Sequence, residues 1–213
     1  MPAVGDIELP DRVVVFFDYQ NVYQGARRAF HGLTDPHWHG QADPVRLAKH
    51  LTADGPFDRE LAQVRVYRGQ PDGKLDPRGY AASRRQHAAW CRSSLVELTV
   101  RPLRYPQGWP ERALAGEGPQ EKGIDVALCL DFALMGERGE YDAGILFSTD
   151  TALELVADLT RRRGRPRAEV AAWSGPGQRN RRLSIKTRNL YCHWIGEDIY
   201  RAVADRTDYS RPG

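Results

Sequence analysis

Acidic and amide side chains follow apolar runs at two distant points of the sequence. Asp18 ends the run "VVVFFD", and Asn21 follows three residues later. Ser148, Thr149 and Asp150 end a second run, "AGILFSTD". Carboxylates packed together repel one another unless a cation neutralises them, and Mg²⁺ or Mn²⁺ suits an all-oxygen set of ligands. Such an ion can bind phosphate oxygens and orient water for attack on a phosphodiester, so these residue types predict metal-dependent hydrolysis if the fold brings them together.

The elements that must position these residues alternate along the chain. Apolar runs rich in β-branched and aromatic residues predict strands over 12–18, 61–68, 95–101, 143–148 and 167–173. Helical spacing and capping residues predict helices near 21–31, 44–53, 77–91, 121–136 and 150–163. Strands alternating with helices indicate an α/β fold, in which helices cover both faces of a mostly parallel sheet of about five strands.

The fold class predicts where the polar residues lie. Ligands of parallel sheets bind outside the carboxyl ends of the strands, where Asp18, Asn21 and Asp150 are expected. Asp125 lies in the first turn of the helix over 121–136, which leads through a short loop into the next strand, so Asp125 is expected at the same edge. Each acid alone also has a simpler interpretation as a helix N-cap, since Asp18, Asp125 and Asp150 all lie near helix starts.

Three segments resemble a known family. "VFFDYQNVY" (15–23), "EKGIDVALCLDFAL" (121–134) and "YDAGILFSTDTALEL" (141–155) are similar, in this order, to the motifs of the NYN domains, a branch of the PIN-like nuclease superfamily. The resemblance implies a Rossmann-like three-layer α/β/α sandwich, metal-dependent RNase activity and a Mg²⁺ or Mn²⁺ site. By motif position it implies that Asp18, Asn21, Asp125 and Asp150 are catalytic, and that the three aspartates bind the metal.

The sequence departs from the family pattern at one acid. The family often has a further acid two residues after Asp150, where this chain has Ala152. Glu154, one helical turn beyond Asp150, either supplies the missing metal ligand or is an ordinary surface residue. Asp131 also matches the motif, but it lies about 240° around the helix from Asp125, so it is expected to have a structural role or to support the metal ligands without binding the metal itself.

Ala152 leaves two functional hypotheses open. The first is a metal-dependent ribonuclease that hydrolyses single-stranded RNA. The second is an RNA-binding module that keeps the fold with weak or no catalysis. A hydrolase of small phosphorylated substrates ranks last, because an aspartyl-phosphate phosphatase would need an acid two residues after Asp18, where this chain has Gln20.

Basic and aromatic residues near the same edge predict contacts with RNA. The net charge of +3 and the pI near 8.8 permit a polyanionic partner without requiring one. Cations would bind the phosphate backbone, and an aromatic side chain could stack on an unpaired base. The predicted nucleic-acid-binding residues are Arg68, Arg104, Tyr105, Lys122, Arg179, Arg181 and Arg182.

The remaining expectations concern organisation and location. Residues 1–11 are expected to be an N-terminal extension, 12–175 the NYN/PIN-like domain, and 176–213 a basic and aromatic extension packing on that domain. No signal peptide and no apolar run of membrane-spanning length is found, so a cytoplasmic protein is expected. The widely spaced cysteines and the pair His37 and His39, which has no third ligand nearby, do not indicate zinc. The oligomeric state stays open.

Overall fold

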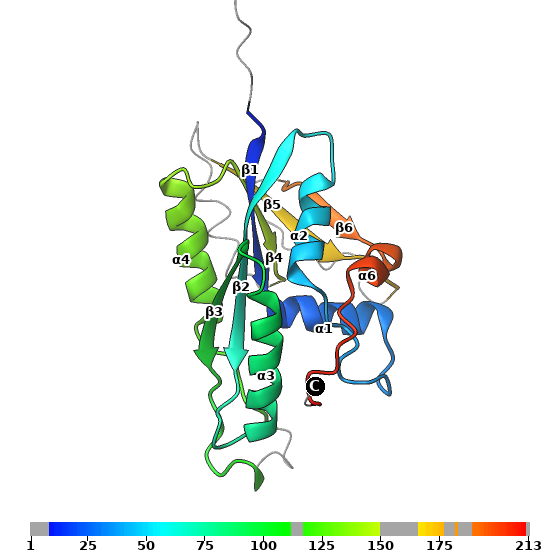
Figure 1. Ribbon diagram of the computed structural model, residues 1–213, viewed down its shortest axis with the longest axis vertical. Coiled ribbons are helices and arrows are strands. Elements are labelled where there is room, and N and C mark those ends of the chain that lie inside the picture. Colours follow the sequence, from blue (N-terminus) through cyan, green and yellow to red (C-terminus); the bar gives the residue numbers. More distant parts are fainter. Residues whose placement is uncertain (1–8, 112–116, 150–165, 177–181, 183–188, 212–213) are drawn as a thin grey trace, which may run out of the picture.

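The computed structural model describes residues 9–111, 117–149, 166–176, 182 and 189–211. In this part of the chain, parallel strands form one sheet in the order β3-β2-β1-β4-β5-β6 (Figure 1). The strands are β1 (Asp11–Asp18), β2 (Arg59–Gln70), β3 (Val96–Pro102), β4 (Ala143–Phe147), β5 (Arg167–Trp173) and β6 (Cys192–Ile195). The helices are α1 (Tyr19–Phe30), α2 (Pro44–Ala53), α3 (Pro77–Trp90), α4 (Ile124–Glu137) and α6 (Glu197–Val203). No helix among the described residues combines the length and the apolar character needed to cross a membrane.

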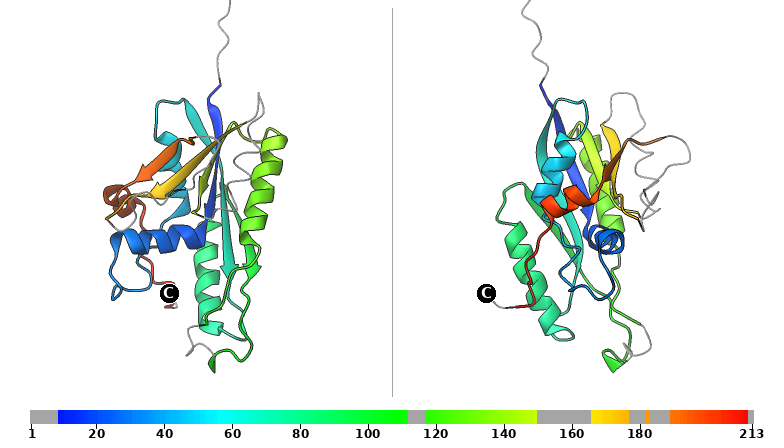
Figure 2. Two further views of the ribbon diagram at one scale, coloured as in Figure 1. Left: turned by 180° about the vertical axis from the view of Figure 1, so that it is seen from behind. Right: turned by 90° about the vertical axis from the view of Figure 1, so that its right-hand side faces the viewer.

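Helices cover both faces of the sheet (Figure 2). Alternate residues of β1 point to opposite faces, as the period of a strand requires. Val13, Val15 and Phe17 belong to the core shared with α1, α2 and α6. Val14 and Phe16 belong to the core shared with α4. The described elements therefore form the three-layer α/β/α sandwich that the sequence predicts, with β1 buried at its centre.

Aspartates start three of the helices. The carboxylates of Asp18, Asp43 and Asp76 each accept a hydrogen bond from the backbone N–H three residues later, at 2.8 to 3.3 Å. Such caps satisfy N–H groups that the first turn of a helix leaves unpaired. Asp18 therefore does serve as an N-cap, so any further role depends on its other contacts.

The boundaries expected from the sequence differ from the observed ones by at most three residues in the described elements. The helix expected over 150–163 lies outside the described residues. The sheet differs in one respect, because it has six strands where about five were expected. The added strand is β6, which pairs with β5 and is followed directly by α6.

Candidate active site

Asp18 is a buried carboxylate at the end of the central strand. Only 5% of its surface is exposed. Its Oδ2 accepts hydrogen bonds from Nδ2 of Asn21 at 2.5 Å and from Oγ of Ser148 at 3.0 Å. Its Oδ1 accepts the backbone N–H of Asn21 at 3.3 Å. These donors come from α1 and from the end of β4, so they hold one carboxylate between two neighbouring strands.

The side-chain amide of Asn21 links the ends of β1 and β4, because its nitrogen and its oxygen each form a hydrogen bond. Its Nδ2 donates to Asp18, and its Oδ1 accepts a hydrogen bond from Oγ1 of Thr149 at 2.7 Å. The orientation of the amide is thus set by two different partners. The structure brings together Asp18, Asn21 and the Ser-Thr pair after β4, as the rule for strand ends predicts.

Glu121 is a second carboxylate at this edge, and the sequence analysis does not identify it. Its Oε1 accepts the backbone N–H of Gly69, near the end of β2, at 2.6 Å. A Cβ at residue 69 would overlap Leu103 and Glu121, so the glycine permits this close approach. Burial raises the pKa of Glu121, and the negative charge of Asp18 adds to the increase. The Gly69 N–H and the Arg68 cation offset these effects only in part.

Asp125 lies in the first turn of α4 and is half-buried. The contact between Glu121 and Gly69 shows that α4 begins at the edge where β2 ends, as expected. Within the described residues, Asp18, Glu121 and Asp125 do not form a set whose ligand oxygens all lie within 4.8 Å of one another. The participation of Asp125 in the site therefore stays a prediction.

Asp131 has the structural role expected from its place on the helix. Its Oδ2 accepts hydrogen bonds from Nη2 of Arg65 at 2.6 Å and from the hydroxyl of Tyr67 at 2.8 Å. This ion pair ties α4 to the face of β2. The Asp131 carboxylate is therefore engaged in contacts with β2.

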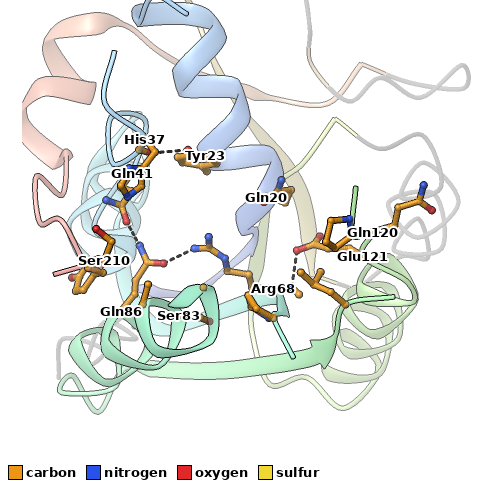
Figure 3. Close-up of a pocket in the computed structure, with 17 residues that line it drawn as sticks. Gln20, Tyr23, His37, Gln41, Arg68, Ser83, Gln86, Gln120, Glu121 and Ser210 are labelled. Atoms are coloured by element: carbon orange, nitrogen blue, oxygen red, sulfur yellow. Dashed lines mark hydrogen bonds between the residues drawn. The ribbon is translucent and has the colours of Figure 1, made fainter. Parts of the chain in front are cut away.

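A pocket of about 610 Å³ opens beside Glu121 (Figure 3). Its walls come from α1, α3, the end of β2, the segment before α4 and the C-terminal residues around 209–210. Pockets of this size accommodate a small organic ligand such as one nucleotide. The side chains that line the pocket include the polar or charged groups of Gln20, Tyr23, Arg68, Gln86, Gln120 and Glu121.

Arg68 places a positive charge in the wall of this pocket. Its guanidinium lies 5.0 Å from the ring centre of Tyr19 and 5.9 Å from that of Trp90. Nη1 of Arg68 donates to Oε1 of Gln86 at 2.5 Å, and Gln86 donates in turn to Gln41. Burial lowers the pKa of Arg68, although a guanidinium remains charged at neutral pH. The stacked and hydrogen-bonded arrangement holds the cation in one place.

The other residues expected to contact RNA divide into packed and exposed ones. Tyr105 is packed, since its ring lies 5.4 Å from that of Trp109 and its hydroxyl accepts the N–H of Asp72 at 3.1 Å. Arg104 and Lys122 are exposed at the same edge. Tyr105 is half-buried, and its role in contacting RNA stays a prediction.

Arg182 is half-buried, and its Nη1 donates to the carbonyl of Leu190 at 3.5 Å. Several residues of the predicted site lie outside the described part of the chain. They are Asp150, Glu154, Arg179 and Arg181, together with Ala152.

The fold and the motif residues together define a PIN-like protein. Residues 12–186 match the NYN domain, so the chain belongs to the NYN family, within the PIN-like superfamily, as the sequence motifs predict. A protein of unknown function from Vibrio parahaemolyticus has a similar structure, with a TM-score of 0.50 and 17% sequence identity. The similarity covers 89% of this chain and 94% of that one, and at this identity it concerns the fold alone. No curated protein shows significant similarity to the sequence.

Proposed function

We propose that this protein is a metal-dependent ribonuclease that hydrolyses phosphodiester bonds of single-stranded RNA. The observation that carries the proposal is the pair of carboxylates at the end of the central strand. Asp18 is buried and accepts hydrogen bonds from Asn21 and Ser148, and Glu121 lies close enough for the charge of Asp18 to contribute to raising its pKa. Acids whose pKa is shifted by burial and by a neighbouring charge are concentrated at functional sites.

A divalent cation fits the donors present. Asp18 and Glu121 offer carboxylate oxygens, which Mg²⁺ and Mn²⁺ prefer, and a cation would relieve the repulsion that raises the pKa of Glu121. Asp125, Asp150 and Glu154 are proposed as further ligands on the basis of the family motifs. Mg²⁺ or Mn²⁺ would supply Lewis acidity towards a phosphodiester.

The chain's own residues would position the substrate. Asn21 and Ser148 fix the orientation of Asp18, so the carboxylate does not reorganise when RNA binds. The Arg68 cation attracts the phosphate backbone towards the pocket. A pocket of this size, with Glu121 in its wall, can accept one unpaired nucleotide, whereas a base within a duplex cannot enter it. These features favour single-stranded RNA.

The test is cleavage of a labelled single-stranded RNA by purified protein in Mg²⁺ or Mn²⁺. Asp18→Asn keeps a good N-cap but removes the charge, so it is expected to lower the cleavage rate roughly 100-fold or more with the fold intact. Asp198→Asn, which removes an exposed charge in the first turn of α6, is the matched control and should cleave as the wild type does.

Each alternative result has a definite meaning. Equal cleavage by Asp18→Asn would identify a contaminating nuclease and refute the proposal. RNA binding without metal-dependent cleavage would favour the RNA-binding module, the second hypothesis that Ala152 supports. Cleavage of duplex RNA at the same rate would refute the proposed preference for single strands.

A further inference from the structure

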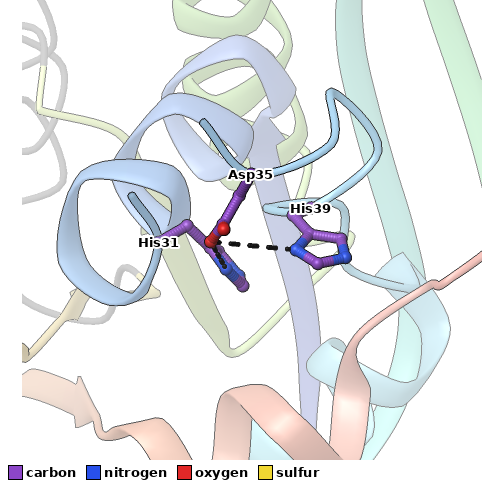
Figure 4. A group of neighbouring side chains, drawn as sticks. All are labelled: His31, Asp35 and His39. Atoms are coloured by element: carbon purple, nitrogen blue, oxygen red, sulfur yellow. Dashed lines mark hydrogen bonds and ion pairs between the residues drawn. The ribbon is translucent and has the colours of Figure 1, made fainter. Parts of the chain in front are cut away.

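Three side chains that can bind metals meet at the far end of α1 (Figure 4). His31 follows the last residue of α1, and Asp35 and His39 come from the loop after it. Nδ1 of His31 lies 3.2 Å from Oδ2 of Asp35, and Nδ1 of His39 lies 3.9 Å from the same oxygen. The helix between Asp18 and His31 is about 18 Å long, so this cluster is separate from the candidate active site.

The loop holds the Asp35 carboxylate in position. The backbone N–H of Gly32 donates to Oδ2 of Asp35 at 3.0 Å. The same oxygen lies within 3.9 Å of a ring nitrogen of each histidine.

His39 provides a second, independent observation. Its Nδ1 is completely buried and has no hydrogen-bond partner. A buried polar atom without a partner is unfavourable, and native proteins rarely contain one without a reason. This nitrogen faces Asp35, the residue that His31 contacts from the other side. A bound cation would give it a partner.

The surroundings hold the cluster in place. The hydroxyl of Tyr200, on α6, lies 2.8 Å from Nε2 of His31 and accepts the N–H of Gly40 at 2.8 Å. A histidine that binds a metal through one ring nitrogen commonly donates the other N–H to such a partner. Arg27 donates to the carbonyls of Asp35 and His39 at 3.2 and 3.0 Å, which fixes the loop that carries both ligands.

We propose that His31, Asp35 and His39 bind one divalent transition-metal ion, Zn²⁺, at a site distinct from the nuclease edge. Donor atoms around a tetrahedral Zn²⁺ lie roughly 3.3 Å apart, so the separation between His31 and Asp35 already fits and His39 must approach by about half an ångström. A pocket of about 350 Å³ borders both histidines and leaves room for a water as a fourth ligand. Two imidazole nitrogens select against Mg²⁺.

The ion would cross-link two segments of the chain. It would join the end of α1 to the loop that carries His37 and Gln41, which line the larger pocket. The contact of His31 with Tyr200 would also connect the metal site to α6. Zn²⁺ is therefore expected to raise the melting temperature by a few degrees at saturating concentration.

The test is calorimetric titration of the full-length protein with Zn²⁺. It is done in an Asp18→Asn, Glu121→Gln background, which removes the two carboxylates that the structure places at the nuclease edge. One Zn²⁺ per chain is expected. His39→Ala and Asp35→Asn, both in the loop, should weaken binding by roughly 100-fold. His37→Ala is the matched control, because His37 lies in the same loop, is 65% exposed and is outside the cluster.

The results decide between the proposal and its alternatives. Circular dichroism of the metal-free variants establishes that each one is folded. Unchanged Zn²⁺ affinity in His39→Ala, equal weakening in His37→Ala, or competition by millimolar Mg²⁺ would overturn the proposal, as would the absence of binding to the wild type. No RNA is present, so failure of the ribonuclease proposal would not affect the outcome.

Discussion

The ionised form of Glu121 lowers the stability of the folded protein but is needed for the proposed metal binding. Its pKa is raised by burial and by Asp18, so its ionised form destabilises the folded protein as the pH rises through that pKa. The same ionised form is the one that attracts a cation. Conflicts of this kind are characteristic of functional sites, where a protein keeps a charge that folding alone would not favour.

Glu121→Gln should therefore have opposite effects on two measurements. The glutamine oxygen can still accept the Gly69 N–H while the repulsion with Asp18 is gone, so stability towards urea at pH 7 should be equal or higher. Affinity for Mn²⁺ should fall roughly 10-fold, and its increase with pH should become shallower. Glu140→Gln, in the exposed turn before β4, should change neither quantity. Unchanged Mn²⁺ affinity would exclude Glu121 from the metal site.

Only those residues of the candidate active site that belong to a local sequence pattern can be predicted from the sequence. Asp18 and Asn21 are recognisable because a strand end followed by a cap is a local pattern. Glu121 is not, because a glutamate in "PQEKG" resembles an exposed loop residue, and it is half-buried in the structure, where it contacts Gly69, 52 residues earlier. The proposed metal site of His31, Asp35 and His39 has no local sequence pattern either, since the first residue lies at a helix end and the others in a loop.

At the scale of elements, buried polar contacts of Glu169 connect β6 to the rest of the sheet. Nε2 of His193 lies 2.8 Å from Oε2 of Glu169 on β5, and Glu169 also pairs with Arg59 on β2. Side-chain exposure is 3% or less for all three. Burial favours the neutral form of Glu169, but its hydrogen bonds with His193 and Arg59 outweigh this, so its pKa is lowered.

Glu169→Gln should lower the free energy of unfolding by about 2–4 kcal/mol at pH 7, because it leaves a buried arginine without its counter-ion. The unfolded glutamate has a pKa near 4.3, and the folded pKa is lower. The contribution is thus present above pH ~4.3 and is lost as the pH falls through the folded value, so the difference from the wild type should shrink in acid.

Urea denaturation between pH 3 and 7 measures this effect. Glu197→Gln is the control, because Glu197 forms only an exposed pair with Arg201 and should change stability by less than ~0.5 kcal/mol. A constant difference between wild type and Glu169→Gln across this pH range would show that the carboxylate charge is not what stabilises β6.

The contacts of His193 with Glu169 also explain why β6 is not predicted from the sequence. Five strands are predictable because their apolar runs are long enough to identify, as in "VVVFF". Residues 192–195, "CHWI", are short and place a histidine at a buried position. Only the charges of Glu169 and Asp54, supplied by other parts of the chain, make that position suitable for His193.

At the scale of the whole molecule, the sheet continues beyond the domain boundary expected at residue 175. Ile195, Tyr200 and Val203 belong to the same core as Phe17 of β1. We therefore predict that a chain ending at residue 175 loses its cooperative unfolding transition. A chain ending at residue 205 keeps β6 and α6 and should unfold cooperatively.

Circular dichroism during urea titration distinguishes the two chains. A cooperative transition of wild-type midpoint in the chain of 175 residues would show that the segment from 176 onward is a separate extension. Loss of the transition in both chains would instead show that the residues after 205 are needed, among them Thr207, whose carbonyl accepts a hydrogen bond from Gln41.

The two ends of the described chain lie at opposite edges of the sheet, which has a practical consequence. β1 begins at Asp11, on the edge away from the pocket, whereas Tyr209 and Ser210 line the pocket itself (Figure 1). A carrier protein or surface linker joined ahead of Asp11 would leave the pocket open. A fluorescent dye attached after Arg211 would sit at its mouth, where it could report the arrival of a ligand in real time.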